Sequence, residues 1–357
     1  MFTLFLPHNT QNMAQRRQTS ILLIYTGGTI GMIRNPLTGA LESFNFDHLL
    51  RHVPELRQFN LDISSRAFNP PIDSSDMNPS LWAKLAEVIY TNYERYDGFV
   101  VLHGTDTMAF TASALSFMLE GLMKPVILTG SQLPIGVLRT DGKENLLTAI
   151  EIAAAKNEDG TPVVPEVCIY FHEKLMRGNR CTKISADSFD AFKSHNCPNL
   201  ATAGIEIQYN RHLIKPYDAS AKLKPHYAMD SNIIIFSLFP GIRREVVQKI
   251  LEGKELKGII FRTFGSGNAP QAQWLIDALT EATRQGKVIV NVTQCLAGSV
   301  KMSLYEAGRQ LLEAGIISGH DITVEAALAK MMFLLGKKLS PDEVRRQMRR
   351  NIAGEIS

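Results

Sequence analysis

The chain has 357 residues, of which 45% are hydrophobic and 20% are charged, with a formal net charge of +3. This composition is typical of a folded globular protein and excludes the disordered and fibrous classes, while the length favours two domains over one. Basic pairs occur near both ends, but there is no basic stripe with interleaved aromatic residues. We therefore expect no nucleic-acid partner.

The cysteines and the apolar segments bear on cellular location. The cysteines at 168, 181, 197 and 295 have no C-x-x-C spacing and no disulfide framework, which favours reduced thiols. Residues 2–6 are apolar but too few for a signal peptide, and no run approaches the roughly 20 apolar residues of a membrane span. We expect a cytoplasmic protein with no membrane partner. Met13 is an alternative start, which would make residues 1–12 non-native.

Strand-type and helix-type patterns alternate along the first two-thirds of the chain. In chain order, strand-type runs lie at 21–25, 99–102, 125–129 and 167–171, and helix-type patterns lie at 79–89, 107–120 and 141–156. Asn78 followed by Pro79 is typical of a helix start. This alternation predicts a parallel sheet with helices on both faces.

A second α/β series follows a polar, irregular segment at 210–230, which we interpret as a linker or small hairpin. Its strand-type runs lie at 232–236, 258–261 and 287–291, and helix-type patterns follow from 321 onward and from Pro341. We therefore predict an N-terminal α/β domain at 20–211, a linker at 212–231 and a C-terminal α/β domain at 232–357.

Two threonine-bearing segments each follow a strand-type run. Thr26-Gly27-Gly28-Thr29 follows residues 21–25, and His103-Gly104-Thr105-Asp106-Thr107 follows residues 99–102. Ligands of open α/β folds bind where parallel strands end, so these loops predict a site for hydroxyl chemistry. A purely structural turn is the alternative for the first segment alone. Its spacing does not fit a G-x-G-x-x-G nucleotide loop, and it has no Walker lysine.

A threonine hydroxyl is a poor nucleophile until another group accepts its proton. The segment Arg177–Lys183 follows the strand-type run 167–171, so Lys183 could reach the same sheet edge and pair with Asp106. A desolvated lysine can act as a base, although a paired carboxylate opposes that shift. On spacing alone, a surface or salt-bridge lysine is the commoner interpretation.

Four motifs in order carry a family resemblance. They are Thr-Gly-Gly-Thr-Ile-Gly (26–31), Asp-Ser-Ser-Asp-Met (73–77), His-Gly-Thr-Asp-Thr-Met (103–108) and Arg-Gly-Asn-Arg-Cys-Thr-Lys (177–183). Further matching segments lie at 96–100, 129–132, 265–271 and 293–295. Over residues 20–355 the chain resembles the bacterial L-asparaginase family, specifically its cytoplasmic type I branch.

The resemblance implies a two-domain asparaginase-like fold, with a larger N-terminal parallel-sheet domain and a smaller C-terminal flavodoxin-like or Rossmann-like α/β domain. It implies hydrolysis of L-asparagine to L-aspartate and ammonia, without metal or cofactor. Thr29 matches the acylated nucleophile, and Thr105, Asp106 and Lys183 match a second threonine triad. The family pattern also implies a homo-oligomer, with a homotetramer built as a dimer of dimers. Type I relatives can be activated by asparagine, but no effector residues can be assigned here.

The same resemblance implies the substrate contacts. Ser74 and Ser75 match the loop that holds the α-carboxylate, and Asp106 matches the carboxylate that binds the α-ammonium group. The glycine turns at Gly28 and Gly104 let the backbone approach the substrate, and backbone groups near Thr105 and Ser131 match the oxyanion and water-binding region. Asn268 matches a residue that reaches substrate across a dimer, although a helix-capping asparagine is an equal alternative.

One departure from the family pattern leaves the activator of Thr29 unassigned. Family members carry a lid tyrosine after the first glycine turn, whereas residues 32–46 contain none and Ala40 stands near its place. Tyr25 precedes the turn, but its direction is not given by the sequence.

Two other functions are kept open. An amino-acid-binding sensor is favoured by the missing tyrosine and opposed by the retained lysine. An ammonia-releasing amidotransferase subunit shares the threonine loops, but such subunits carry an additional N-terminal domain, and only about 20 residues precede the first strand here.

The preference for asparagine over glutamine is not set by the sequence, because the two substrates differ by one methylene, which is worth only about 1–3 kcal/mol of discrimination.

Overall fold

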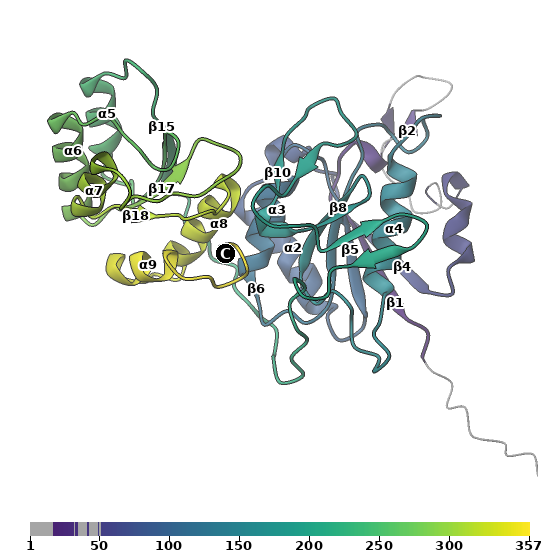
Figure 1. Cartoon of the computed structure of the whole chain (residues 1–357). Helices are drawn as coiled ribbons and strands as arrows, with labels where there is room; N and C mark the ends of the chain where they lie inside the picture. Colours follow the sequence, from purple (N-terminus) through teal and green to yellow (C-terminus); the bar gives the residue numbers. More distant parts are fainter. Residues whose placement is uncertain (1–16, 32, 35–40, 43–48, 50) are drawn as a thin grey trace, which may run out of the picture.

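The computed structural model in Figure 1 describes residues 17–31, 33–34, 41–42, 49 and 51–357. The alternative start at Met13 and the lid position at Ala40 lie outside these residues. The described chain forms two α/β domains side by side, each with its own sheet, as expected.

The N-terminal sheet has eight strands in the order β13-β12-β9-β8-β7-β5-β1-β4. Its parallel strands are β1 (Ser20–Tyr25), β4 (Asp62–Ala67), β5 (Gly98–Leu102), β7 (Val126–Thr129) and β8 (Val167–Phe171). Its antiparallel edge consists of β9 (Lys174–Arg177), β12 (Ala201–Ala203) and β13 (Ile207–Tyr209). The parallel-sheet prediction is confirmed, with an antiparallel extension that the sequence did not indicate.

Strand order reverses between β1 and β5 in this sheet. The chain adds β4 outside β1 and then crosses to add β5, β7 and β8 on the other side. This is the flavodoxin-type order, in which ligands bind where the order reverses. The reversal point is where the two threonine loops begin.

Helices cover both faces of the N-terminal sheet (Figure 1). On one face, α2 (Pro79–Thr91) and α3 (Met108–Met118) pack against side chains such as Leu22. On the other face, α4 (Gly142–Ala154) packs against the alternating set that includes Leu23. Successive strand residues point to opposite faces, so an unbroken apolar run is required to fill both layers.

The C-terminal sheet has four parallel strands in chain order. They are β15 (Ile233–Ser237), β16 (Gly258–Thr263), β17 (Val288–Thr293) and β18 (Ile317–Ser318). One face is covered by α5 (Arg244–Leu251), α6 (Gln273–Arg284) and α7 (Glu306–Glu313). The other face is covered by α8 (Val324–Gly336) and α9 (Pro341–Met348).

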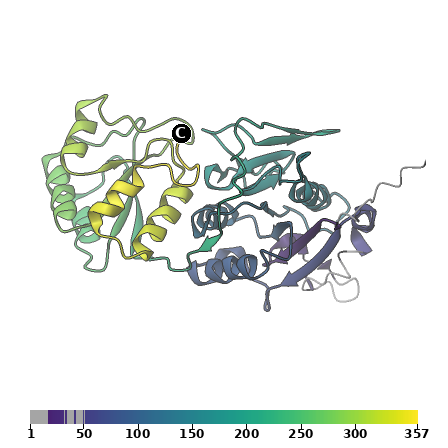
Figure 2. The same cartoon turned by 90° about the horizontal axis from the view of Figure 1, so that it is seen from below.

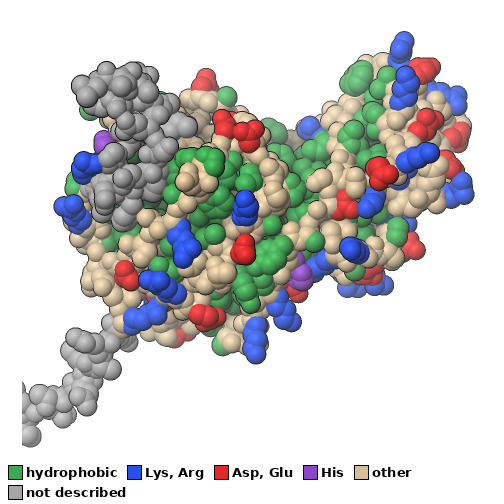
Figure 3. Space-filling view, turned by 180° about the vertical axis from the view of Figure 1, so that it is seen from behind, with side chains coloured by type: hydrophobic (Ala, Val, Ile, Leu, Met, Phe, Trp, Pro, Cys, Tyr) green, Lys and Arg blue, Asp and Glu red, His purple; other side chains and the backbone are tan. Residues whose placement is uncertain are grey.

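The two domains share one buried cluster. Helix α8 packs on α3 of the N-terminal domain, and Phe117 stacks on Phe333 with ring centroids 6.1 Å apart. Figure 3 shows hydrophobic side chains gathered where the domains meet, with charged side chains spread over the outer surface. The relative position of the domains is therefore fixed by apolar burial.

The segment expected as a linker, 212–231, contains the short strand β14 (Lys224–Pro225), which pairs with β6 (Leu119–Glu120) of the N-terminal domain. The exact domain boundaries at 211 and 231 stay predictions. None of the described helices is long and apolar enough to cross a membrane.

Helix α2 begins as its sequence predicts, and it offers a stability test. The Asn78 side chain accepts hydrogen bonds from the Ser80 and Leu81 amides, and Pro79 occupies the first helical position. We expect Asn78→Ala to lower the free energy of unfolding by about 1 kcal/mol, because two amide donors lose their acceptor. Chemical denaturation measures this. Asn78→Asp is the control, and its oxygen should preserve the stability; equal losses in both variants would contradict a capping role.

Candidate active site

Three loops meet at the reversal point of the N-terminal sheet. A Cβ on Gly28 would lie 2.5 Å from the Gly104 backbone, and a Cβ on Gly104 would lie 2.6 Å from the Ser74 Oγ. Only glycine allows such contacts between the loops that follow β1 and β5. Gly28 also has a φ of +89°, a conformation that other L-residues rarely adopt. The loops that carry Thr29, Ser74 and Thr105 are therefore pressed together.

Hydrogen bonds at the end of β1 hold the first loop. Thr26 donates to the Leu102 carbonyl from both its amide and its hydroxyl, each at 3.0 Å, which ties β1 to β5. The Tyr25 hydroxyl donates to the Gly28 carbonyl at 3.2 Å, and the Tyr25 ring lies where a Cβ on Gly31 would be. Thr29 begins a 3₁₀ turn (Thr29–Gly31) above this ring and is partly exposed.

The direction of Tyr25, which the sequence left open, is thus toward the buried layer on the α4 side of the sheet, where its ring packs against the turn that carries Thr29. Burial raises the pKa of Tyr25 to about 12, so its hydroxyl stays protonated at neutral pH. A neutral hydroxyl that donates to the Gly28 carbonyl holds the turn that carries Thr29.

The second loop is a short 3₁₀ turn, Ser74–Asp76, which precedes α2. The Asp73 carboxylate accepts the Ser75 amide at 2.9 Å, and the Thr107 hydroxyl donates to the Ser74 carbonyl at 2.7 Å. Ser74 is buried against the glycine turns, whereas Ser75 is exposed at the surface of the site. The two serines thus occupy the same loop in different environments.

Lys183 joins Thr105 and Asp106. It lies in β10 (Thr182–Lys183), and its Nζ is 2.8 Å from the Thr105 Oγ1 and 2.7 Å from the Asp106 carboxylate. The Lys183 side chain is 18% exposed and that of Asp106 is 62% exposed, so the carboxylate can bind a further cation from solution. Lys183 lies 78 positions from Thr105 and 77 positions from Asp106 along the chain, and the structure brings the three side chains together.

Gln132 also contacts the site, and it was not among the residues we singled out. Its Oε1 accepts the Thr105 hydroxyl at 3.3 Å, so Thr105 donates to Gln132 while accepting from Lys183. The Asp141 carboxylate fixes this turn by accepting the Gln132 and Leu133 amides. Ser131 is buried and donates to the Leu133 carbonyl at 2.6 Å. The sequence signal was present, since Gln132 lies in one of the matching segments.

His103 supports the Thr105 loop from inside the protein, as a packed strand-end residue. Its Nδ1 donates to the Gly104 carbonyl at 2.7 Å, and its Nε2 accepts from Thr111, whose oxygen in turn accepts the Trp82 indole N–H. Complete burial lowers the His103 pKa to about 4. The ring is therefore neutral at physiological pH, and it anchors the Gly104 peptide next to Thr105.

Asn268 lies apart from these loops, in the turn that follows β16 of the C-terminal domain. It does not cap α6, because that helix begins at Gln273 with Ala272 at its N-cap. Among the described residues, no hydrogen bond joins Asn268 to the N-terminal loops. The capping alternative is thus excluded, and a role across subunits stays a prediction.

In the described part of the chain, no cluster of three or more His, Cys, Asp or Glu residues is arranged to hold a metal. The four cysteines are free thiols. What the arrangement offers is two threonine hydroxyls on adjacent loops, a lysine amine bonded to one of them, and an exposed carboxylate. Such a set is suited to acyl transfer from a small substrate that carries a cationic group.

Comparison with known proteins gives consistent results. The family model Asparaginase, N-terminal, matches residues 20–215, and the model Glutaminase/Asparaginase C-terminal domain matches residues 232–348. L-asparaginase 1 of Escherichia coli (strain K12) is 44% identical over 342 residues, which cover 96% of this chain and 99% of that protein.

Two further similarities also extend over nearly all of this chain. The 60 kDa lysophospholipase of Homo sapiens is 43% identical over 359 residues, covering 94% of this chain and 61% of that protein. The crystal structure of L-asparaginase I from Vibrio cholerae has a TM-score of 0.86 and 42% identity, covering 95% of this chain and 99% of that one.

The buried His103 predicts a pH dependence of stability. Its pKa is about 4 in the folded protein and 6.5 in the unfolded chain. Between pH 6.5 and pH 4, His103 binds a proton in the unfolded chain but not in the folded protein. The free energy of unfolding therefore has its full value above pH 6.5 and falls by roughly 3 kcal/mol as the pH drops toward 4. Urea denaturation at several pH values measures this slope. His103→Gln should remove most of it, and an unchanged slope in that variant would assign the effect to other groups.

Proposed function

We propose that this chain, which belongs to the asparaginase family, hydrolyses L-asparagine to L-aspartate and ammonia. The single observation that carries the proposal is the bonding of Lys183 to both Thr105 and Asp106 beside the Thr29 turn. A structural salt bridge would need only the carboxylate. A lysine amine that also contacts a threonine hydroxyl at a ligand-binding sheet edge has a partner for proton transfer.

In the first step, the Thr29 hydroxyl oxygen attacks the side-chain amide carbon of asparagine. A Thr29 ester forms, the C–N bond breaks, and the nitrogen takes up a proton and leaves as ammonia. The group that accepts the Thr29 proton is unassigned, because the lid stretch that includes Ala40 lies outside the described residues. The Tyr25 hydroxyl donates to the Gly28 carbonyl and holds the Thr29 turn.

In the second step, water attacks the ester carbonyl and releases Thr29 and aspartate. In this step the Thr105 hydroxyl turns from Gln132 to the Lys183 amine, so that Thr105 gives its proton to Lys183 while it takes one from the water. The ester C–O bond then breaks, and the Thr29 oxygen takes up the proton that Lys183 returns through Thr105. Asp106 holds the amine in place through the 2.7 Å contact. The 2.8 Å separation between Lys183 Nζ and Thr105 Oγ1 supports this transfer, because it lies within direct hydrogen-bond reach. The reaction requires no metal and no cofactor.

The ends of the amino acid have matching partners in this proposal. The loop with Ser74 and Ser75 receives the α-carboxylate, and the exposed Asp106 carboxylate receives the α-ammonium group. The side-chain amide then lies against Thr29 and Thr105, and backbone groups near Thr105 and Ser131 bind the oxyanion and the water. The contact between the Gly28 and Gly104 turns supports this placement, because it brings the two threonine loops together.

We further propose that the protein works as a cytoplasmic homo-oligomer, a dimer of dimers, in which Asn268 contacts substrate bound to the partner. Exposed apolar side chains follow β15 and β17, at the same end of the C-terminal sheet as the Asn268 turn. They are Phe239, Leu296, Leu304 and Tyr305. Such a group of exposed large side chains supports an interface with another copy.

Ammonia release tests the proposed reaction. We expect turnover of L-asparagine to exceed that of L-glutamine, and a sigmoidal concentration dependence would support effector activation of the kind found in type I relatives. Thr29→Ala and Thr105→Ala should each lower kcat at least about a hundredfold, because each removes a group that bonds or transfers a proton in a chemical step.

Thr91→Ala is the matched control, because the exposed Thr91 hydroxyl lies at the end of α2, where it donates to the Glu87 and Val88 carbonyls and accepts from the Asn92 side-chain amide. Circular dichroism must show that all variants are folded. Near-normal turnover in either active-site variant would remove that threonine from the mechanism. Tight asparagine binding with no ammonia from the wild-type protein would favour the sensor instead.

A further inference from the structure

The segment just before Lys183 is held by the opposite domain. Lys183 follows a 3₁₀ turn, Gly178–Arg180, which lies against α3 of the N-terminal domain. Three of the four residues that precede Lys183 nevertheless make side-chain hydrogen bonds to residues of the C-terminal domain, including the last residues of the chain. They are Asn179, Arg180 and Thr182. The fourth, Cys181, is buried.

Arg180 makes the most extensive of these contacts. Its guanidinium group is 2% exposed and donates to both oxygens of the Asp321 carboxylate, at 2.6 and 3.2 Å. It also donates to the Glu355 carbonyl at 2.6 Å, the Ser357 hydroxyl at 2.9 Å and the Asn196 carbonyl at 3.1 Å. A planar guanidinium with two bonds to one carboxylate fixes both distance and orientation.

The partners of Arg180 are themselves fixed. Asp321 lies just before α8 and also accepts the Ser357 amide at 3.0 Å. Burial opposes the charge of Asp321, but the bonds from Arg180 and Ser357 outweigh it and lower its pKa to about 2. Glu355 is completely buried and pairs at 2.6 Å with Lys330 of α8, which is also completely buried. The end of the chain is thus bound to the helix that carries the interdomain contact.

Two neighbouring bonds act in the same direction. The Asn179 amide donates to the Ala353 carbonyl at 2.8 Å, and the Thr182 hydroxyl donates to the Glu325 carboxylate of α8 at 3.0 Å. On the far side of Lys183, its strand β10 pairs, within the part of the chain that the structure describes, with the two-residue strand β11 (Phe192–Lys193), and the Ile184 amide donates to the Ala191 carbonyl. The turn that carries Arg180 is therefore the main tether on the chain leading to the lysine.

We propose that Arg180 and Asp321 are positioning residues that hold Lys183 at bonding distance from Thr105. The proposal rests on the proposed function, in which Lys183 receives a proton during hydrolysis. Neither side chain enters the site, so neither should affect substrate binding directly. Both act by fixing the turn that lies three residues before the lysine, across the boundary between the two domains.

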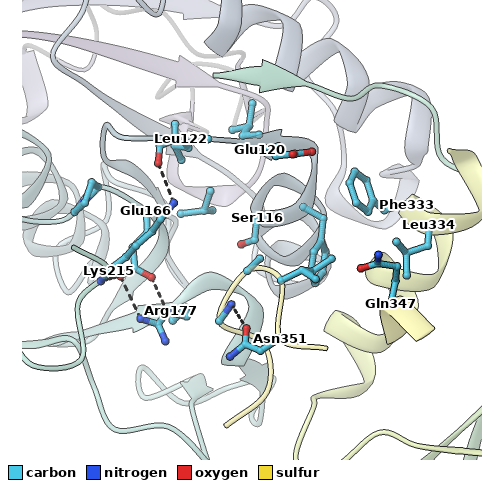
Figure 4. Close-up of a pocket in the computed structure, with 18 of the residues that line it drawn as sticks. Ser116, Glu120, Leu122, Glu166, Arg177, Lys215, Phe333, Leu334, Gln347 and Asn351 are labelled. Atoms are coloured by element: carbon cyan, nitrogen blue, oxygen red, sulfur yellow. Dashed lines mark hydrogen bonds and ion pairs between the residues drawn. The ribbon is translucent and has the colours of Figure 1, made fainter. Parts of the chain in front are cut away.

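Arg177 provides a matched control in the same segment. Its guanidinium is largely buried and pairs with Glu166 at 2.6 Å, and it also donates to the Leu213 carbonyl at 2.6 Å. Figure 4 shows this pair at a pocket lined by residues of both domains, among them Glu166, Phe333 and Gln347. The polar partners of Arg177 lie in the N-terminal domain and in the segment that follows it, although its side chain also packs against Gly354. Arg177→Gln therefore breaks a buried ion pair of the same kind without releasing the contact to Asp321.

The test compares Asp321→Asn, Arg180→Lys and Arg177→Gln by ammonia release from L-asparagine and by thermal melting. Asparagine has nearly the shape of aspartate, so Asp321→Asn should fold. We expect its kcat to fall about ten- to a hundredfold while KM changes less than about threefold, because a displacement near 1 Å is sufficient for such a loss. The kcat of Arg180→Lys, which keeps the positive charge, should fall less than that of Asp321→Asn. Arg177→Gln should melt earlier yet keep kcat within about twofold of the wild type.

A double-mutant cycle separates positioning from general damage. In a Lys183→Met background, Asp321→Asn should lower the residual kcat by less than about twofold, since the lysine that it positions is absent. An equal loss in both backgrounds, or a kcat of Asp321→Asn within about twofold of wild type, would overturn the proposal. Wild-type turnover in Lys183→Met alone would instead overturn the proposed function, so the two failures are distinguishable.

Discussion

The contact between two backbone turns, at Gly28 and Gly104, is the constraint on which the site depends. A Cβ at either position would lie 2.5 to 2.6 Å from neighbouring atoms, so the loops that carry Thr29, Ser74 and Thr105 can meet only through glycine. The contact occurs where strand order reverses between β1 and β5. In open α/β sheets, ligands bind outside the carboxyl ends of the strands at such a point.

The polar groups around this contact divide into buried supports and exposed reactants. His103 and Tyr25 are buried and neutral at physiological pH, and each donates to a glycine carbonyl of a loop. Asp106 and Thr29 remain accessible, and Lys183 approaches from a third segment. Because the buried residues that support the loops are rigid and neutral, the charged groups of the site interact with substrate without competition from buried charges.

Much of this arrangement could be predicted from the sequence. The features that could not be predicted were missed for physical reasons. The glycine-threonine loops follow apolar strands, so their meeting at one sheet edge was predictable. Strand β4 was missed because its residues, Asp-Ile-Ser-Ser-Arg-Ala, form an edge strand without an apolar run, and the order of the sheet could not be known without it. The bond from Arg180 to Asp321 spans 141 positions and has no local pattern that would indicate it. The roles of the site residues stay predictions.

The most direct test of the account is to locate the covalent intermediate. Lys183→Met should slow the water step, so incubation with L-asparagine followed by acid quenching and peptide mass spectrometry should show an aspartyl group on Thr29. The same experiment on Thr29→Ala/Lys183→Met should show none. An aspartyl group on Thr105, or continued turnover by the Thr29→Ala enzyme, would contradict the assignment of Thr29 as the nucleophile and of Lys183 as its partner in hydrolysis.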